Sequence, residues 1–253
     1  MFERELEFAH SLADRAAEIA MRFYEGGFEV REKPDSTPVT EADLAVEAMI
    51  RERLASTFPG DAVLGEEHGM EGSGRRVWVV DPIDGTKNFA ARIQIWATLI
   101  ALMVDDEPVV GVVGAPALGE RYGAASGAGA TCNGSPIHVS GRASLDEAMV
   151  SFAGIGDWRS GPYADGFEAL GATAARTRGF GDFWGHVLVA RGAVDVMAEE
   201  QLHVWDWAAL AAVVREAGGR VSRLDGGALA EGSSVLTTNG LLHDEVVRLF
   251  PSG

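Results

Sequence analysis

The sequence has 253 residues, of which 47% are hydrophobic and 23% are charged, as is typical of a globular protein with one large or two smaller domains. Its formal net charge of -17 argues against nucleic-acid binding through a basic face. The single cysteine, Cys132, cannot form an internal disulfide and favours a reducing cytoplasm. The charged N-terminus is unlike a signal peptide, and no apolar run approaches the ~18 residues of a membrane span. We therefore expect a cytoplasmic protein without a membrane partner.

The first predicted element is an amphipathic helix over residues 3–23, because apolar residues recur every three or four positions before a glycine pair ends the pattern. The polar stretch 28–38, which contains Lys33, is expected to form a hairpin or loop. It is either solvated surface or a lid over a nearby site. A second helix is predicted to begin at Thr40, because Thr40-x-x-Asp43 resembles a capping box. Capping alone is a sufficient explanation for both residues.

Two short apolar runs are each followed by acids. Residues 62–64 predict a strand that leads into Glu66, and residues 77–80 predict a buried strand that leads into Asp81. We expect the second strand to stop at Asp81, because Pro82 cannot donate a ladder hydrogen bond. Residues 69–74 are expected to form a loop between them. If the strands are parallel, Glu66 lies near Asp81; the alternative for Glu66 is ordinary surface charge.

The stretch after the second strand combines features of a metal site and a phosphate site. Asp84 is expected to cap a short helix over residues 86–89. Asp81 and Asp84 lie three residues apart and offer the oxygen ligands that hard cations prefer. The free N–H groups of a helix start suit a phosphate. A metal and a phosphate in one place indicate phosphoryl chemistry.

Further apolar runs joined by short turns predict an antiparallel meander over residues 96–104, 109–113, 121–125 and 137–139. Gly127, Gly129 and Gly134 are interpreted as turn residues, because no strand–GxGxxG–helix arrangement is present. Beyond residues 140–145 strands and helices alternate, which predicts an α/β second half. The proposed domains are an N-terminal α+β part, 1–140, and a C-terminal α/β part, 141–253. The expected C-terminal strands are 149–152, 176–179, 194–197, 221 and 235–237, and the helices are 163–170, 183–190, 205–217 and 241–250.

Asp206 is the outstanding acid of the second half. It lies at a predicted helix start between large apolar residues. An N-cap is one explanation. A buried charge is costly unless it is paired or bound to a metal, so a specific partner is the alternative.

The motifs together resemble a known family. Gly65-Glu66-Glu67, Asp81-Pro82-Ile83-Asp84-Gly85-Thr86 and Trp205-Asp206-x-Ala208-Ala209, with Val39-Thr40-x-x-Asp43, are similar to the inositol monophosphatase superfamily of metal-dependent phosphatases. The resemblance covers essentially the whole chain and implies a layered αβαβα sandwich of the α/β class. Within the superfamily the chain most resembles the histidinol-phosphatases, on residues 33–43, 86–89, 96–102, 178–183 and 192–195.

The resemblance implies a set of metal ligands. Glu66, Asp81 and the backbone carbonyl of Ile83 would hold one Mg²⁺, and Asp81, Asp84 and Asp206 would hold a second. Glu66 would also contact a third, weaker ion, so two or three ions are expected. Six-coordinate Mg²⁺ keeps waters, one of which would attack the phosphate.

The resemblance also assigns catalytic and phosphate-binding roles. Thr86 and Asp43 would form a hydrogen-bonded pair that orients or deprotonates the attacking water, with Glu66 contributing to catalysis. The amides of Gly85 and Thr86 would bind phosphate oxygens at the helix start. The reaction would be an in-line displacement by water without a covalent phosphoenzyme.

Substrate selection is expected to come from acids in the pocket wall, because histidinol carries an ammonium and an imidazole. Asp182 and Glu199 match positions that line the pocket in this family, together with Asp206; Asp182 and Glu199 are alternatively surface or capping acids. Trp158 would either cover the substrate ring or belong to the core. His68 is expected to be exposed or structural, and His203 lies next to the site.

The predicted function is therefore Mg²⁺-dependent hydrolysis of L-histidinol phosphate. The alternatives are myo-inositol monophosphatase or a broad-specificity phosphatase, and, from another class, an inactive regulator that keeps the fold. An inactive regulator should have lost at least one of Glu66, Asp81, Asp84 and Asp206, and all four are present. The expected partner is a small phosphate monoester, and the resemblance implies a homodimer.

Overall fold

The structure is a computed structural model that describes residues 2–26, 30–32, 38–156, 158 and 161–250. The predicted lid around Lys33 lies outside the described residues. On either side of it, β1 (Val30–Glu32) and β2 (Pro38–Thr40) pair antiparallel as a small separate sheet.

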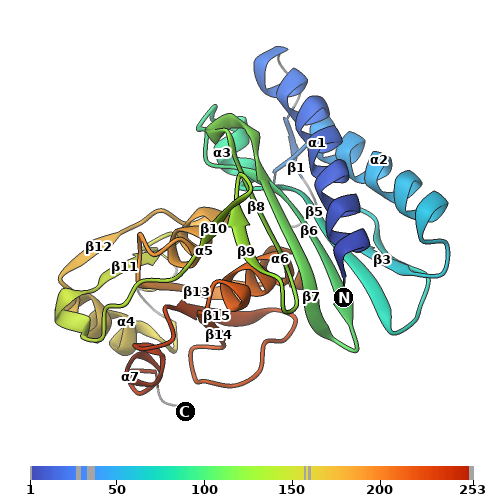
Figure 1. The fold of residues 1–253 in the computed structure, drawn as a ribbon. Helices are drawn as coiled ribbons and strands as arrows, with labels where there is room; N and C mark the ends of the chain where they lie inside the picture. Colours follow the sequence, from blue (N-terminus) through green and yellow to red (C-terminus); the bar gives the residue numbers. More distant parts are fainter. Residues whose placement is uncertain (1, 27–29, 33–37, 157, 159–160, 251–253) are drawn as a thin grey trace.

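A mixed eight-stranded sheet forms the centre of the N-terminal half, with the strand order β10-β9-β8-β7-β6-β5-β3-β4 (Figure 1). All neighbours are antiparallel except β3 and β5, which are parallel. The meander predicted from the sequence is confirmed. The strands are β3 (Ala62–Gly65), β4 (Gly69–Glu71), β5 (Arg76–Asp84), β6 (Ala97–Val104), β7 (Glu107–Ala115), β8 (Glu120–Ala125), β9 (Gly129–Cys132) and β10 (Ser135–Ile137).

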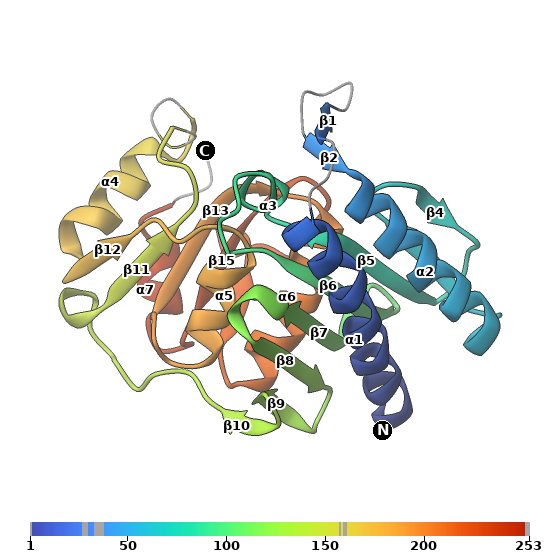
Figure 2. The same cartoon turned by 90° about the horizontal axis from the view of Figure 1, so that it is seen from above.

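Two long helices, α1 (Glu3–Gly26) and α2 (Glu41–Thr57), cover one face of this sheet (Figure 2). Their apolar stripes bury Leu12, Val46, Ile50 and Leu54 against sheet residues such as Trp78. Both helices agree with the periodicity of the sequence. Packing of an amphipathic face, rather than intrinsic propensity, accounts for most of such a helix's stability.

The C-terminal half contains a five-stranded sheet with the order β12-β11-β13-β15-β14. Between the two sheets lie α5 (Asp182–Ala190) and α6 (Val204–Glu216), whose apolar residues pack on both. On the outer face lie α4 (Ala164–Thr173) and α7 (His243–Val247). The strands are β11 (Met149–Phe152), β12 (Arg176–Arg178), β13 (Val196–Leu202), β14 (Arg220–Ser222) and β15 (Ser233–Thr238).

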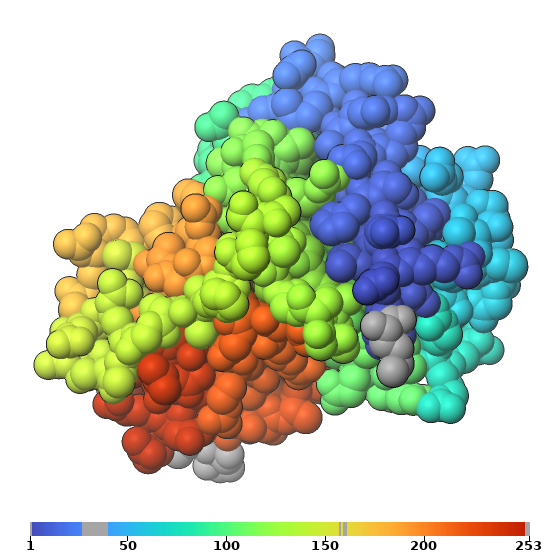
Figure 3. All heavy atoms as spheres, in the orientation of Figure 1, coloured from blue at the N-terminus to red at the C-terminus, as the bar shows by residue number. Residues whose placement is uncertain are grey.

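The layers therefore run helices, sheet, helices, sheet, helices, and the predicted αβαβα sandwich of the α/β class is confirmed. In the space-filling view the first two helices and the C-terminal segments occupy opposite sides of the molecule (Figure 3). The chain passes from one sheet to the other between β10 and β11. The division into two domains at residue 140 stays a prediction. No helix among the described residues is both long and apolar enough to cross a bilayer.

Three local predictions were wrong. Residues 69–71 form the edge strand β4 instead of a loop, because they pair with β3. The strand β9 was missed, because its short, glycine-flanked sequence has little strand pattern. The strand β5 does not end at Asp81 but continues through Pro82 to Asp84.

Candidate active site

A bulge in β5 brings Asp81 and Asp84 to one place. Asp81 pairs with Leu99 of β6, and Asp84 pairs with Ala97. Three residue intervals along β5 therefore lie opposite two along β6, so β5 contains one extra residue. In a regular strand, residues three apart point to opposite faces; the extra residue re-aims the side chains. Proline is tolerated at a bulge because its missing N–H is not needed there. The carbonyl of Pro82 accepts a hydrogen bond from Thr98 Oγ1 at 2.8 Å.

The first turn of α6 adds a third carboxylate from the other half of the chain. One carboxylate oxygen from each of Asp81, Asp84 and Asp206 lies within 4.8 Å of the others. Asp81 is buried, and its Oδ1 has no hydrogen-bond partner among the described residues. Three converging hard oxygen donors, one of them buried and unpartnered, fit a hard divalent cation such as Mg²⁺. The predicted convergence of these three acids is confirmed.

The pKa values of these acids are all raised. Burial and the neighbouring Glu66 carboxylate raise the pKa of Asp81 well above its ordinary value. Burial and Asp182 do the same for the pKa of Asp84. Burial raises the pKa of Asp206 to about 7. Carboxylates crowded in this way repel one another unless a cation shares them, which is a signature of a functional site.

The acids also organise the backbone around them. Asp84 Oδ2 accepts the backbone N–H of Phe183 at 2.8 Å and so fixes the start of α5. Asp206 Oδ2 accepts the N–H of His203 at 2.7 Å, within a capping box at the start of α6. Asp206 is thus the third residue of that helix and not its N-cap. The capping and metal-binding explanations for Asp206 are compatible, because a carboxylate has two oxygens.

Glu66 follows β3, whose parallel pairing with β5 sets Gly65 beside Val80. The predicted proximity of Glu66 to Asp81 is therefore confirmed, and both residues interact electrostatically. Glu66 and Asp206 line the same pocket.

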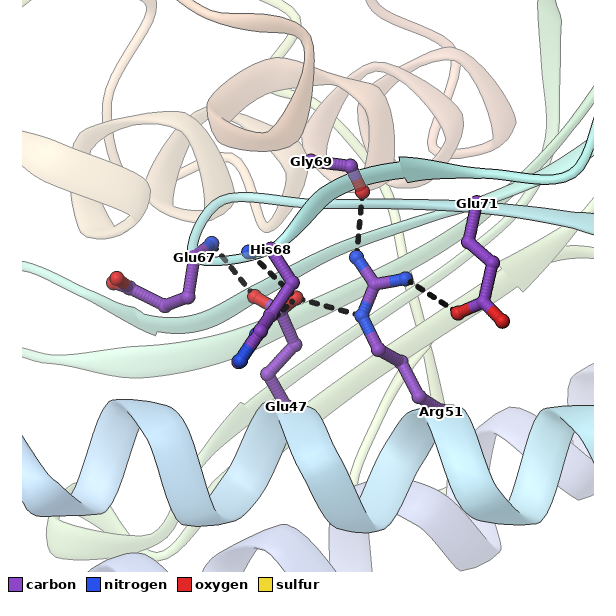
Figure 4. Close-up of polar contacts among 6 residues, drawn as sticks. All are labelled: Glu47, Arg51, Glu67, His68, Gly69 and Glu71. Carbon is purple, nitrogen blue, oxygen red and sulfur yellow. Dashed lines mark hydrogen bonds and ion pairs between the residues drawn. The ribbon is translucent and has the colours of Figure 1, made fainter.

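A buried glutamate on α2, which the sequence analysis missed, holds the turn that carries Glu66 (Figure 4). The Glu47 carboxylate, 0% exposed, accepts the backbone N–H groups of Glu67 at 2.7 Å and His68 at 3.1 Å. His68 Nδ1 lies 3.1 Å from the same carboxylate, so His68 is structural, as expected. A Cβ on Gly65 would lie 2.3 Å from Glu47 Oε1, so only glycine permits this approach.

Arg51 extends this contact along α2. Its Nε donates to Glu47 Oε1 at 2.8 Å, and its Nη2 donates to the carbonyl of Gly69 at 2.6 Å. Glu71 pairs with the same guanidinium at the surface, at 3.3 Å. The helix is thereby joined to both ends of the turn between β3 and β4.

The helix α3 (Thr86–Ala90) begins beside the acid cluster. Its N-cap is Gly85, in a left-handed conformation with φ +80°, and not Asp84 as predicted. A Cβ at Gly85 would lie 2.9 Å from the carbonyl oxygen of Ile95, so the sharp turn and the tight contact both require glycine. Gly85 and Thr86 line the pocket.

The expected hydrogen bond between Thr86 and Asp43 is not formed. Thr86 Oγ1 donates to the carbonyl of Ile83 at 3.0 Å, three residues back. Asp43 Oδ2 accepts from the N–H of Thr40 at 2.8 Å, as the predicted capping box requires, and also from Thr40 Oγ1 at 2.5 Å. The side chains of Thr86 and Asp43 therefore each form a hydrogen bond with a nearby backbone group instead of with each other. Asp43 Oδ1 has no hydrogen-bond partner among the described residues, and burial raises the pKa of Asp43 to about 7.

A pocket lined by Asp84 and Asp206 of the cluster has a volume of about 560 Å³. Its lining includes both predicted substrate-selecting acids, Asp182 and Glu199. Asn88 Nδ2 donates to Asp182 Oδ2 at 2.8 Å, which links α3 to α5. Burial and the Glu199 carboxylate raise the pKa of Asp182 to about 6. These two acids therefore lie close together in the pocket wall.

Two other predicted residues lie at the margins. His203 lines the pocket beside Asp206; its Nδ1 lies 2.5 Å from Glu231 Oε1 and its ring stacks on Trp205. Trp158 is buried and stacks on Phe167 with ring centroids 4.5 Å apart. It lines an adjoining pocket and is a core residue, in agreement with the second of its two explanations.

Comparisons with known proteins identify the class. The inositol monophosphatase family model matches residues 2–252. The chain is 49% identical to a histidinol-phosphatase of Mycobacterium tuberculosis over the whole of both chains. It is 45% identical to a histidinol-phosphatase of Streptomyces coelicolor, over 96% of this chain and 95% of that one. A solved inositol monophosphatase from Anabaena (Nostoc) sp. PCC 7120 superposes with a TM-score of 0.87 at 30% identity, covering 98% and 95% of the two chains.

The five-layer fold and the acid-lined pocket beside a helix start define a phosphatase. The chain belongs to the inositol monophosphatase family.

Proposed function

We propose that this protein hydrolyses L-histidinol phosphate to L-histidinol and phosphate in histidine biosynthesis, with Mg²⁺ as cofactor. The observation that carries the proposal is a pocket with two groups of acids. Asp81, Asp84 and Asp206 converge on one place, and the last two of them line a pocket whose wall also contains Asp182 and Glu199. The first group suits cations that bind a phosphate, and the second suits a positively charged substrate. The names of the relatives from M. tuberculosis and S. coelicolor support the same substrate.

The converging oxygens of Asp81, Asp84 and Asp206 support one part of the ligand assignment, and the family resemblance supplies the rest. We assign one ion to Glu66, Asp81 and the carbonyl of Ile83, and another to Asp81, Asp84 and Asp206, with a third, weaker ion at Glu66. Mg²⁺ bound there supplies charge neutralisation of the phosphate and lowers the pKa of the attacking water. The Ile83 carbonyl already accepts from Thr86 Oγ1, and its second lone pair is available.

The protein's own groups orient the phosphate and move protons. The amides of Gly85 and Thr86, at the start of α3, are the proposed donors to phosphate oxygens. Asp43 Oδ1, buried and unpartnered among the described residues, is the proposed acceptor of a proton from the attacking water. Its pKa of about 7 suits a general base at neutral pH. We propose that Thr86 turns from the Ile83 carbonyl to share this role.

The reaction is then an in-line displacement in which the water oxygen bonds to phosphorus and the P–O bond to the substrate's alcohol breaks. The departing alkoxide takes a proton from solvent. No covalent phosphoenzyme is required.

A second candidate is hydrolysis of myo-inositol 1-phosphate, alone or within a broad specificity. The observation in its favour is the similarity to solved inositol monophosphatases, such as Thermotoga maritima IMPase TM1415, with a TM-score of 0.88 at 32% identity over 98% of this chain and 96% of that one. The acids in the pocket wall favour the cationic substrate, because they attract its ammonium group by charge in addition to accepting the hydrogen bonds that a polyol could also donate.

Parallel turnover assays decide between the two. We expect kcat/KM for L-histidinol phosphate to exceed that for myo-inositol 1-phosphate, with activity lost on chelation of Mg²⁺ and restored by its return. A higher kcat/KM for the inositol ester would overturn the first assignment in favour of the second.

The remaining expectations are also proposals. A homodimer is implied by the family resemblance, and a cytoplasmic location by the single cysteine, which is free in the structure.

A further inference from the structure

A buried histidine behind the pocket contacts one of the substrate-selecting acids. His186, on α5, is 0% exposed and packs against two neighbouring strands of the second sheet, β13 and β15. Its Nδ1 lies 2.7 Å from Thr237 Oγ1 on β15. Its Nε2 lies 2.8 Å from Glu199 Oε2 on β13. Both ring nitrogens therefore have partners, and the ring cannot move without breaking one of these contacts.

The chemistry of the partners sets the direction of these hydrogen bonds. A hydroxyl can donate or accept, whereas an ionised carboxylate only accepts. Glu199 therefore requires a proton on Nε2, and Thr237 can donate its hydroxyl proton to Nδ1. Both ring nitrogens of His186 are then used, because Nε2 donates to Glu199 and Nδ1 accepts from Thr237.

The other side of Glu199 faces the substrate pocket. Glu199 is 5% exposed, and it lines both the pocket of the acid cluster and the pocket that adjoins it. His186 contacts Oε2, and among the described residues no hydrogen bond to Oε1 is seen. The contact with His186 therefore fixes the side chain of Glu199 where it lines the pocket.

We propose that His186 is a positioning residue for substrate selection, which holds the Glu199 carboxylate in the pocket wall so that it pairs with the cationic end of the phosphate ester. The inference deepens the proposed function and rests on it. It assigns to His186 the placement of one carboxylate in the pocket wall. Asp182, held by Asn88 from the opposite side, completes the anionic wall.

The same sheet contains a matched control. His243, on α7, is 1% exposed, and its Nδ1 lies 3.0 Å from Thr238 Oγ1. Thr238 follows Thr237 on β15, so the two threonines face opposite sides of the sheet. The second nitrogen of His243 lies 3.0 Å from Ser222 Oγ, a neutral partner. His243 lines neither pocket. Both histidines are buried, and in both one ring nitrogen contacts a threonine hydroxyl. The other ring nitrogen contacts a pocket carboxylate in His186 and a serine hydroxyl in His243.

The experiment compares His186→Phe with His243→Phe. Each variant is assayed for kcat and KM on L-histidinol phosphate and on myo-inositol 1-phosphate, at saturating Mg²⁺. In His186→Phe, we expect the ratio of kcat/KM for the cationic ester to that for the uncharged ester to fall by about 10- to 100-fold, the range for a hydrogen bond to a charged group. The loss should lie in KM for the cationic ester rather than in kcat. In His243→Phe the ratio should stay within about twofold of the wild type.

A conservative variant separates positioning from general damage. In His186→Gln, the amide nitrogen can occupy the position of Nε2 and donate to Glu199, so most of the wild-type ratio should return. Binding of L-histidinol, measured by calorimetry in the presence of Mg²⁺ and inorganic phosphate, should weaken in His186→Phe and recover in His186→Gln.

The outcomes distinguish this inference from the proposed function. A wild-type enzyme that prefers the inositol ester would overturn the proposed substrate and this inference with it. A wild-type preference for the cationic ester that persists in His186→Phe would overturn the inference alone. An equal fall of the ratio in both phenylalanine variants would also overturn it, because burial rather than contact with Glu199 would then be the cause.

Discussion

Replacement of Glu47 tests whether a buried carboxylate holds the turn that carries Glu66. In Glu47→Ala, the backbone N–H groups of Glu67 and His68 and the Nε of Arg51 all lose their acceptor. In Glu47→Gln, the volume is kept, but an NH₂ group replaces one acceptor oxygen and faces groups that are themselves donors.

The expected loss of stability follows from these contacts. An orphaned buried donor costs about 1–3 kcal/mol, and removal of one partner of a buried ion pair costs about 3–5 kcal/mol. Because the side chains of Glu47 and Arg51 are 0% and 12% exposed, water replaces the lost acceptor poorly. These losses share one place and do not add. We expect Glu47→Ala to lower the free energy of unfolding by about 4 kcal/mol, or the Tm by about 10 °C.

The informative measurement is metal affinity. Mn²⁺ binding to metal-free protein, followed by electron paramagnetic resonance, should weaken at least ~10-fold in Glu47→Gln, as outer contacts of metal ligands commonly do. Asp61→Asn is the matched control. Asp61 accepts from Arg76 Nε at 2.8 Å and from Trp78 Nε1 at 3.0 Å, and so ties β5 to the loop before β3. This variant should lose stability but keep its affinity for Mn²⁺.

Wild-type affinity for Mn²⁺ in Glu47→Gln would refute the reasoning. So would an equal loss of affinity in Asp61→Asn, because general destabilisation would then explain both.

Three further predictions concern the acid cluster and the turn beside it. Asp84→Asn should lower kcat at least about a hundredfold at saturating Mg²⁺; near wild-type turnover would count against a shared-cation site. Gly85→Ala should weaken inorganic phosphate binding, measured by calorimetry, because its Cβ would meet the Ile95 carbonyl. In metal-free protein, Asp43 and Asp206 keep their protons up to about pH 7, whereas the unfolded chain releases them near pH 4. Folded stability should therefore fall as the pH rises from 4 to 7, and the Tm at pH 8 should lie below that at pH 5. Asp43→Asn should show a smaller fall, and a Tm that rises with pH would contradict the assigned shifts.

The convergence of the acids could be predicted from the sequence, because local rules decide it. Acids follow two apolar strands, Asp206 lies among large apolar residues at a helix start, and parallel pairing places strand ends together. The capping box at Thr40 is equally local, and it formed as predicted.

The features that the sequence did not predict depend on residues that are distant in the chain. The spacing of Glu47 and Arg51 is that of an ordinary i, i+4 ion pair on a helix surface. Only the tertiary fold shows that the pair lies beneath the turn after β3. The presence of Pro82 predicted that β5 ends at Asp81, because proline has no backbone N–H. The strand continues because the bulge lies at Pro82, where no ladder hydrogen bond from that N–H is required. His186 lies in an apolar helix pattern in which a histidine gives no sign of its partner.

The hydrogen bond from Phe183 N–H to Asp84 means that one carboxylate both fixes a helix start and belongs to the acid cluster. One of its oxygens anchors the helix between the sheets, and the other remains for a cation. A cation held by Asp84 would therefore share its ligand with the start of α5, the helix that carries Asp182 and His186. The cation site and this part of the pocket wall thus depend on the same side chain.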